Sequence, residues 1–138
     1  MFYMLDIDTS SYIIRKRPVA VLESMQAKSQ EGNGICISAV TYAELLLGAE
    51  RSGNPRKHHK LIVEFCARMD AIKPWDDRAA ESFSKLQAHL FRIRKGKPIG
   101  INDTMIAGHA LSINATLVTN NKKHFSKVPK LKLDNWVI

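Results

Sequence analysis

Three carboxylates are the side chains of this sequence whose types and positions best suit catalysis. Asp6 ends an apolar run, Glu44 lies among residues that otherwise look like core, and Asp103 opens a segment of small residues. Acidic side chains are rarely buried unless they are paired or hold a metal. Three of them, in a chain of net charge +8, therefore suggest an oxygen-ligand site for a hard cation.

Each acid also has an ordinary structural explanation. Asp103 could cap a helix, Asp6 could end a strand in a turn, and Glu44 could form a buried salt bridge with a basic side chain. As a set placed at junctions between apolar and polar segments, the three acids favour a metal site.

The segments that must position these acids alternate between short apolar runs and helical patterns. Strands are expected at residues 2–6, 35–37 and 115–119, with weaker ones at 70–72 and near 131–133. Helices are expected after a cap at Thr9, Ser10 or Ser11 to residue 16, then over 19–29, 38–51 or 41–51, 57–69, 76–94, 102–112 and 123–125.

This alternation predicts an α/β fold with a central, mainly parallel β-sheet flanked by α-helices. In such sheets, sites form beyond the carboxyl ends of the strands. Asp6 and Asn121 directly follow strands, and Glu44 and Asp103 lie in helices that can meet them there. We expect one domain spanning residues 1–138, since no linker or repeat interrupts the pattern.

Composition narrows the class of protein. Apolar residues make up 45% and charged residues 25% of the chain, which is typical of a soluble globular protein. No stretch is apolar enough to cross a bilayer and no secretion signal is visible, so we expect a cytoplasmic protein without a membrane partner. The two cysteines, Cys36 and Cys66, are expected to be reduced core residues.

The basic residues suggest a polyanionic partner. Lys and Arg number 21 against 13 Asp and Glu, and they gather at residues 15–17, 56–60, 92–97 and 122–132. One such cluster is usually only a solvated face, but four around an acidic centre favour nucleic acid or an acidic protein segment.

Several blocks in order make the chain resemble PIN-domain ribonucleases, and among them VapC toxins of bacterial type II toxin–antitoxin pairs. These blocks are residues 3–6, 37–45, 48–49, 96–100, 102–103, 106–110, 117–121, 125 and 134–136. The resemblance covers nearly the whole length.

The resemblance implies a metal-dependent endoribonuclease with acids around one or two Mg²⁺ or Mn²⁺ ions. Asp6, Glu44 and Asp103 match the acidic triad of the family, as catalytic residues and metal ligands. The fourth acid of the family falls where this chain has Asn121, which is interpreted as an outer supporting residue. Thr119 could hydrogen-bond a metal ligand or simply end a strand.

A second departure concerns the first acid. The family commonly has Thr or Ser and then Asn after it, whereas here Asp6 is followed by Ile7 and Asp8. We prefer Asp6 as the ligand because it ends the apolar strand, with Asp8 or Thr9 as support. A shift of two residues would instead make Asp8-Thr9-Ser10 the signature.

The resemblance also implies partners. It implies a homodimer, a cognate VapB-like antitoxin through which the complex binds operator DNA, and cleavage of the initiator tRNA in its anticodon loop. An amphipathic antitoxin segment is expected near residues 9–29 and 41–51, with an Arg or Lys reaching the acids.

Two other readings stay open from the sequence. A non-catalytic RNA- or protein-binding PIN domain would follow if Ile7 and Asn121 mark a decayed site. The other is a structure-specific DNA nuclease of the same broad fold.

The histidines are weaker candidates for site residues. The pair His58-His59 suits a solvated face, and His109 suits a packed, hydrogen-bonded histidine better than a general base.

Overall fold

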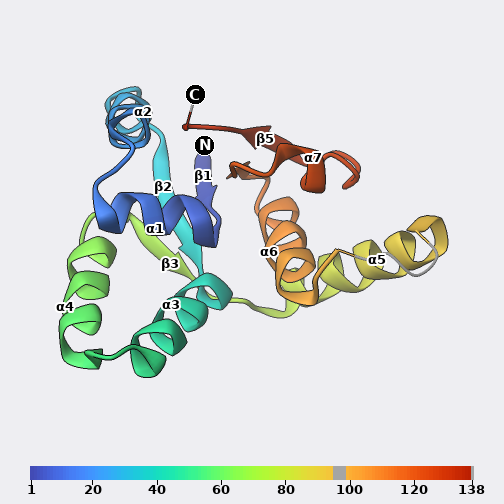
Figure 1. Cartoon of the computed structure of the whole chain (residues 1–138). Coiled ribbons are helices and arrows are strands. Elements are labelled where there is room, and N and C mark those ends of the chain that lie inside the picture. Colours follow the sequence, from blue (N-terminus) through green and yellow to red (C-terminus); the bar gives the residue numbers. More distant parts are fainter. Residues whose placement is uncertain (95–98, 138) are drawn as a thin grey trace.

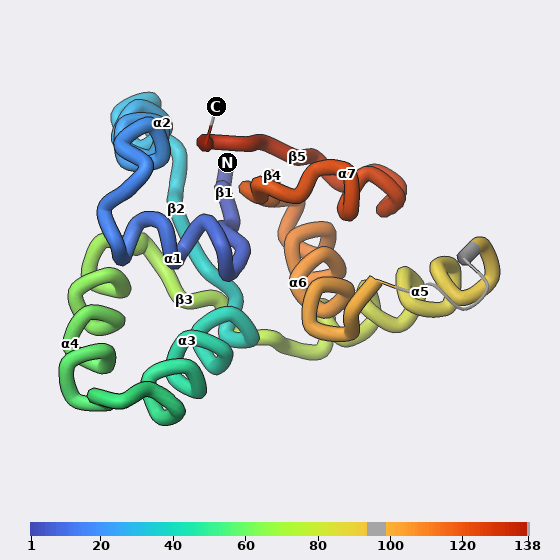
Figure 2. Tube along the Cα trace, viewed as in Figure 1, coloured from blue at the N-terminus to red at the C-terminus, as the bar shows by residue number. Residues whose placement is uncertain are grey.

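The computed structural model describes residues 1–94 and 99–137. Within these residues, five strands form one parallel sheet in the order β3-β2-β1-β4-β5 (Figures 1 and 2). The strands are β1 (Phe2–Leu5), β2 (Gly34–Ser38), β3 (Ala71–Lys73), β4 (Thr116–Val118) and β5 (Lys132–Asp134). The predicted α/β fold is confirmed.

The central strand β1 has β2 on one side and β4 on the other. Tyr3 is level with Ile35 in β2 and with Thr116 in β4. The chain therefore leaves β1 toward one edge and later returns to fill the other edge. Such a reversal of strand order opens a crevice outside the carboxyl ends of the strands.

Helices lie along the chain as α1 (Ile7–Arg15), α2 (Val19–Gln30), α3 (Ala39–Arg51), α4 (Pro55–Cys66), α5 (Asp77–Arg94), α6 (Ile101–Ser112) and α7 (Lys122–Phe125). Most agree with the sequence within a few residues. The expected cap at residues 9–11 is wrong, because α1 begins at Ile7 and its cap is Asp6. The predicted end of α5 at residues 95–98 lies outside the described residues.

Alternate strand residues build two cores, one on each face of the sheet. Met4, Cys36 and Leu117 face the core shared with α5 and α6. Their neighbours Leu5 and Val118 face the other core, which α1, α2 and α4 cover (Figure 2). The two-residue period of a strand produces this division.

A glycine allows α6 to pack closely on α5. A Cβ atom at Gly108 would lie 2.8 Å from the backbone nitrogen and Cα of Phe83. The close approach holds α6, and hence Asp103 in its first turn, against the rest of the fold. No helix in the described ranges is long and apolar enough to span a membrane.

A candidate acidic site at the carboxyl edge of the sheet

Asp6 lies at the carboxyl end of the central strand and is only 5% exposed. Its Oδ1 accepts a hydrogen bond of 2.8 Å from the backbone N–H of Thr9, so the same carboxylate caps α1. Burial raises the pKa of Asp6 above its ordinary value, and hydrogen bonds from Thr119 and Thr9 oppose that rise. A buried carboxylate that is costly to ionise is suited to a nearby cation.

Hydroxyl groups fasten the start of α1 to the strand ends. Thr9 Oγ1 donates to the carbonyl oxygen of Val118 at 3.2 Å, and Ser10 Oγ donates to the carbonyl oxygen of Asp6 at 2.8 Å. The backbone N–H of Asp6 also donates to Val118 at 3.1 Å. The position of Asp6 is therefore fixed by bonds to β4 as well as by its own strand.

Glu44 reaches the same edge from α3. Burial is the main cause that raises its pKa; the charges of Asp103, Asp6 and Asp8 add to the rise, and a hydrogen bond from Asn102 opposes it. Its Oε1 atom is buried and has no hydrogen-bond partner in the part of the chain that the structure describes. An unsatisfied buried carboxylate oxygen is costly, and a metal ion would satisfy it.

Asp103 lies in the first turn of α6, and its side chain is 38% exposed. Its Oδ2 is 3.2 Å from Nε2 of His124 in α7. This is ion-pair distance, but the orientation is not that of a hydrogen bond. Asp103 is thus far more accessible to solvent than Asp6.

A buried pair, His109 and Ser38, links α6 to α3. His109 Nδ1 lies 2.9 Å from Ser38 Oγ, and that same oxygen accepts the backbone N–H of Val40 at 3.1 Å to cap α3. Burial lowers the pKa of His109, which favours the neutral ring. The prediction of a packed, hydrogen-bonded histidine is confirmed, and the pair sets α3 in place for Glu44.

The family of this chain follows from comparison with known proteins. The sequence model that describes the PIN-domain family matches residues 7–131 of this chain. A ribonuclease VapC2 of Haemophilus influenzae is 37% identical over 135 residues, covering 98% of both chains. The chain belongs to the PIN-domain family and, within it, to the VapC toxin endoribonucleases.

Other VapC relatives agree along the full length. A tRNA(fMet)-specific endonuclease VapC of Salmonella typhimurium is 34% identical over 134 residues, covering 97% of both chains. The crystal structure of VapBC2 from Rickettsia felis, bound to a promoter DNA fragment, superposes with a TM-score of 0.90 at 34% identity, over 99% of both chains.

Of the residues predicted for the site, the three acids lie near one another, and Asp8 and Thr9 lie beside Asp6. Asp6, Glu44 and Asp103 are close enough for the charges of the two aspartates to raise the pKa of Glu44. Asp8 is exposed and acts on Asp6 and Glu44 only through its charge, whereas Thr9 contacts Asp6. The structure therefore gives Asp6, not Asp8, the buried strand-end position.

Thr119 and Asn121 lie beside the acids rather than among them. Thr119 is fully buried and hydrogen-bonds to Asp6. Its Oγ1 also accepts the backbone N–H of Asn121 at 2.9 Å, while the side chain of Asn121 is exposed. Thr119 thus connects Asp6 to the loop that carries Asn121.

The acids fit a divalent cation in chemistry but are not drawn together around one point. Within the described ranges, no three His, Cys, Asp or Glu side chains converge closely enough to hold one ion. The site nevertheless supplies carboxylate oxygens, one of them buried and without a partner among the described residues, and these are the ligand atoms that Mg²⁺ prefers.

Sequence reasoning missed two residues of the site, Asn102 and His124. Asn102 hydrogen-bonds to Glu44, and its position next to Asp103 at a helix start was the available signal. His124 approaches Asp103 from α7, which no sequence pattern indicated. Both contacts join segments that are distant along the chain.

Proposed function

We propose that the chain hydrolyses RNA with Mg²⁺, for which Mn²⁺ can substitute, held by Asp6, Glu44 and Asp103. The observation that carries this proposal is the buried Oε1 of Glu44, which has no hydrogen-bond partner in the described part of the chain and lies beside two further carboxylates. A bound divalent ion would neutralise charge on the phosphate and lower the pKa of a bound water.

The residues of the chain contribute orientation and hydrogen bonds. Asp6 is held by Thr9 and Thr119, whose bonds favour its charged form. Asp8 adds negative charge nearby, and the backbone N–H of Asn121 donates to Thr119 Oγ1 beside the site. Asn102 holds Glu44.

We propose the initiator tRNA, cut in its anticodon loop, as the substrate. Relatives from Salmonella typhimurium and Shigella flexneri, at 34% and 36% identity, are named tRNA(fMet)-specific endonucleases. The net charge of +8 suits a polyanion of this kind. Such a substrate is consistent with a cytoplasmic enzyme whose residues 1–138 form one PIN domain.

For the partners, we propose a VapB-like antitoxin, a homodimer of the toxin, and operator DNA bound through the antitoxin. The structures from Rickettsia felis and Salmonella typhimurium are VapBC complexes bound to DNA. A hollow of about 220 Å³ between α1, α3 and α4, lined partly by Ile14, Leu45 and Ile62, suits an apolar antitoxin helix. A cationic side chain of that segment would compete with the metal for the acids.

The deciding experiment incubates the purified protein with total tRNA, with and without Mg²⁺, and maps the cut ends. We expect one main cut in the anticodon loop of initiator tRNA, lost with a chelator and restored by Mn²⁺. Asp70→Asn is the matched control, because Asp70 instead accepts the backbone N–H of Ile35 at 2.7 Å. Binding of tRNA without any Mg²⁺-dependent cut would favour a non-catalytic PIN domain instead.

Two substitutions test the register of the first acid. Asp6→Asn is expected to abolish cutting because it removes a buried charge at the strand end, and Asp8→Asn to retain most of it because Asp8 is exposed. The reverse ranking of cleavage rates would assign the signature to residues 8–10.

The antitoxin proposal has a separate test. The complex with the cognate antitoxin should cleave tRNA far more slowly than the free toxin, and release of the antitoxin should restore the rate. A purified complex as active as the free toxin would contradict inhibition at the acidic site.

A further inference from the structure

A second polar hollow lies beside the acids, around α7. It has a volume of about 230 Å³ and is lined by Asn121, Lys123, His124 and Lys127. The two lysine side chains and that of Asn121 are exposed, and no carboxylate is among these lining residues. The hollow thus offers positive charge and hydrogen-bond donors to a ligand from solvent.

The hollow and the acidic site share a wall. His124 lines the hollow, and its Nε2 lies 3.2 Å from Oδ2 of Asp103. The loop is joined to the acids a second time, because Thr119 bonds both the backbone of Asn121 and the carboxylate of Asp6. A ligand in the hollow therefore lies next to the acids without displacing them.

The short helix that carries the hollow is anchored. Phe125 is 2% exposed and packs into the core that α5 and α6 cover. The ring of His124 packs edge-on against Phe125, with ring centroids 5.2 Å apart at 89°. Figure 2 shows α7 beside β5, above α6. The hollow is therefore held in a fixed place relative to Asp103.

Charge decides the kind of ligand. Two ammonium groups and an amide around a small open hollow suit a phosphate group, which lysine binds as a point charge. A single strand of RNA places a phosphate at every nucleotide, so the strand that enters the acidic site must pass further phosphates over the neighbouring surface. Among the described residues, this hollow is a basic surface that borders Asp103 through His124.

We propose that this α7 hollow binds an RNA phosphate next to the one that is cut, with Lys123 and Lys127 as its main contacts. The inference rests on the proposed function, because it deepens the description of how the substrate is held. It assigns these lysines to substrate binding and leaves the hydrolytic step to the acids.

The binding test uses a single-stranded RNA oligonucleotide and the Glu44→Gln chain without metal, so that nothing is cut. Adding Lys123→Ala and Lys127→Ala should weaken binding and lower the slope of log affinity against log salt by about 1.4, or ~0.7 for each lost phosphate contact. The matched control is Lys57→Ala with Lys60→Ala, two exposed lysines on α4, remote from α7 in Figure 1. An unchanged slope in the α7 pair, or an equal change in both pairs, would overturn the proposal.

The kinetic test uses the otherwise unaltered enzyme with Mg²⁺. The α7 pair should raise KM by about tenfold or more with a much smaller change in kcat, because it removes binding and not chemistry. A fall in kcat with KM unchanged would refute the assignment.

The two tests separate this inference from the proposed function. If the enzyme cuts RNA but the α7 pair matches the control pair, the hollow is not a phosphate subsite and the proposed function stands. If no RNA is cut, the proposed function fails, and the salt slope still reports whether RNA occupies the hollow.

Discussion

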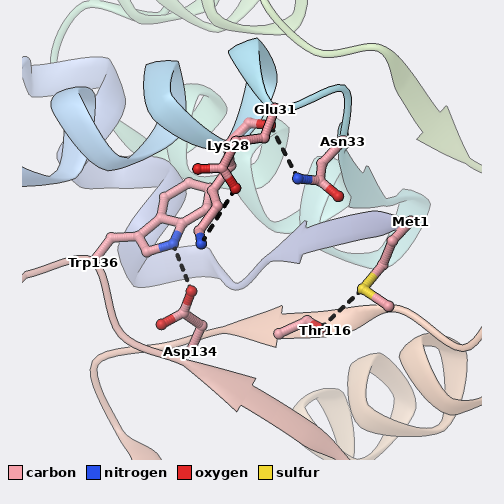
Figure 3. A network of polar contacts seen from close by, with 7 residues as sticks. All are labelled: Met1, Lys28, Glu31, Asn33, Thr116, Asp134 and Trp136. Carbon is pink, nitrogen blue, oxygen red and sulfur yellow. Dashed lines mark hydrogen bonds and ion pairs between the residues drawn. The ribbon is translucent and has the colours of Figure 1, made fainter.

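The carboxylates of Asp134 and Glu44 differ in how their oxygens are engaged. In Asp134, Oδ2 accepts the indole N–H of Trp136 at 3.1 Å and Oδ1 accepts the backbone N–H of Asn135 at 2.9 Å. In Glu44, Oε1 is buried without a partner among the described residues. Figure 3 shows Asp134 and Trp136 within a group of polar residues near α2.

The group around Asp134 fixes the C-terminal segment that carries Trp136 against the rest of the fold. Trp136 is 2% exposed, its ring centroid lies 5.8 Å from that of Tyr3, and its N–H is satisfied by Asp134. The nearby pair of Lys28 and Glu31 is 3.9 Å apart, with side chains 31% and 59% exposed, and an ion pair so open to solvent contributes little. A carboxylate whose oxygens have donors stabilises the protein, whereas Glu44 at the carboxyl edge has an oxygen without a donor among the described residues, which a ligand could satisfy.

The largest expected effect is on cleavage. Asp103→Asn or Glu44→Gln should lower the rate of RNA cutting by more than about 100-fold, because loss of a metal ligand exceeds the 10–100-fold of an outer-shell change. Asp134→Asn should leave the cleavage rate within about threefold of that of the unaltered chain, because Asp134 lies outside the acidic site and Asn keeps an acceptor for Trp136. Single-turnover cleavage of initiator tRNA measures both, and a large loss in Asp134→Asn would remove the distinction between the two groups.

The second prediction concerns stability. Asp134→Ala leaves the buried indole N–H of Trp136 without an acceptor, so the free energy of unfolding should fall by about 1–3 kcal/mol. Asp134→Asn is the control and should lose less. Urea denaturation followed by tryptophan fluorescence measures the change; an unaltered midpoint in Asp134→Ala would mean that this contact does not hold the tail.

Much of this arrangement could be predicted from sequence. Short apolar runs around Met4, Ile37 and Leu117 have the composition of buried parallel strands, and the alternation with helices defines the α/β fold. Topology then brings Asp6, Glu44 and Asp103 to one edge, because strand ends and the following helix starts meet there.

The remaining features depend on contacts between distant segments. The bonds from Asn102 to Glu44 and from Thr119 to Asp6, and the approach of His124 to Asp103, need the folded geometry. The cap of α1 was predicted wrongly because Thr9 and Ser10 are good cap types, yet their hydroxyls bond to Val118 and to Asp6 inside the fold. Local preference was overridden by tertiary bonds.

The third prediction tests how α3 is positioned. Ser38→Ala removes the cap of α3 and the partner of His109, so stability should fall by about 1 kcal/mol, and cleavage should fall by less than about tenfold because Glu44 remains. Ser52→Ala, at the other end of α3 where Ser52 Oγ bonds to the carbonyl oxygen of Ala49 at 2.7 Å, is the control and should leave the cleavage rate unchanged. Equal effects of the two changes on cleavage would show that the Ser38–His109 link does not serve the site.

The smallest predicted effect has the opposite sign to that of Asp134→Ala. In metal-free protein, Glu44→Gln should raise the melting temperature by a few degrees at pH 7, because ionised Glu44 is desolvated and faces other acids. The gain is small because the side chain is only half-buried. Mg²⁺ should raise the melting temperature of the unaltered chain and have less effect on Glu44→Gln.

The pH dependence of this gain follows from the raised pKa of Glu44. Above its ordinary pKa of 4.5, the unfolded chain loses the Glu44 proton while the folded chain keeps it. The stability contributed by that proton therefore falls as pH rises from 4.5 to the folded pKa, and the full penalty remains at higher pH. The advantage of Glu44→Gln in melting temperature should thus be largest near pH 7 and vanish below about pH 4. Thermal scans of both chains in chelator across this range measure the difference; an advantage independent of pH would mean that charge at Glu44 does not cause it.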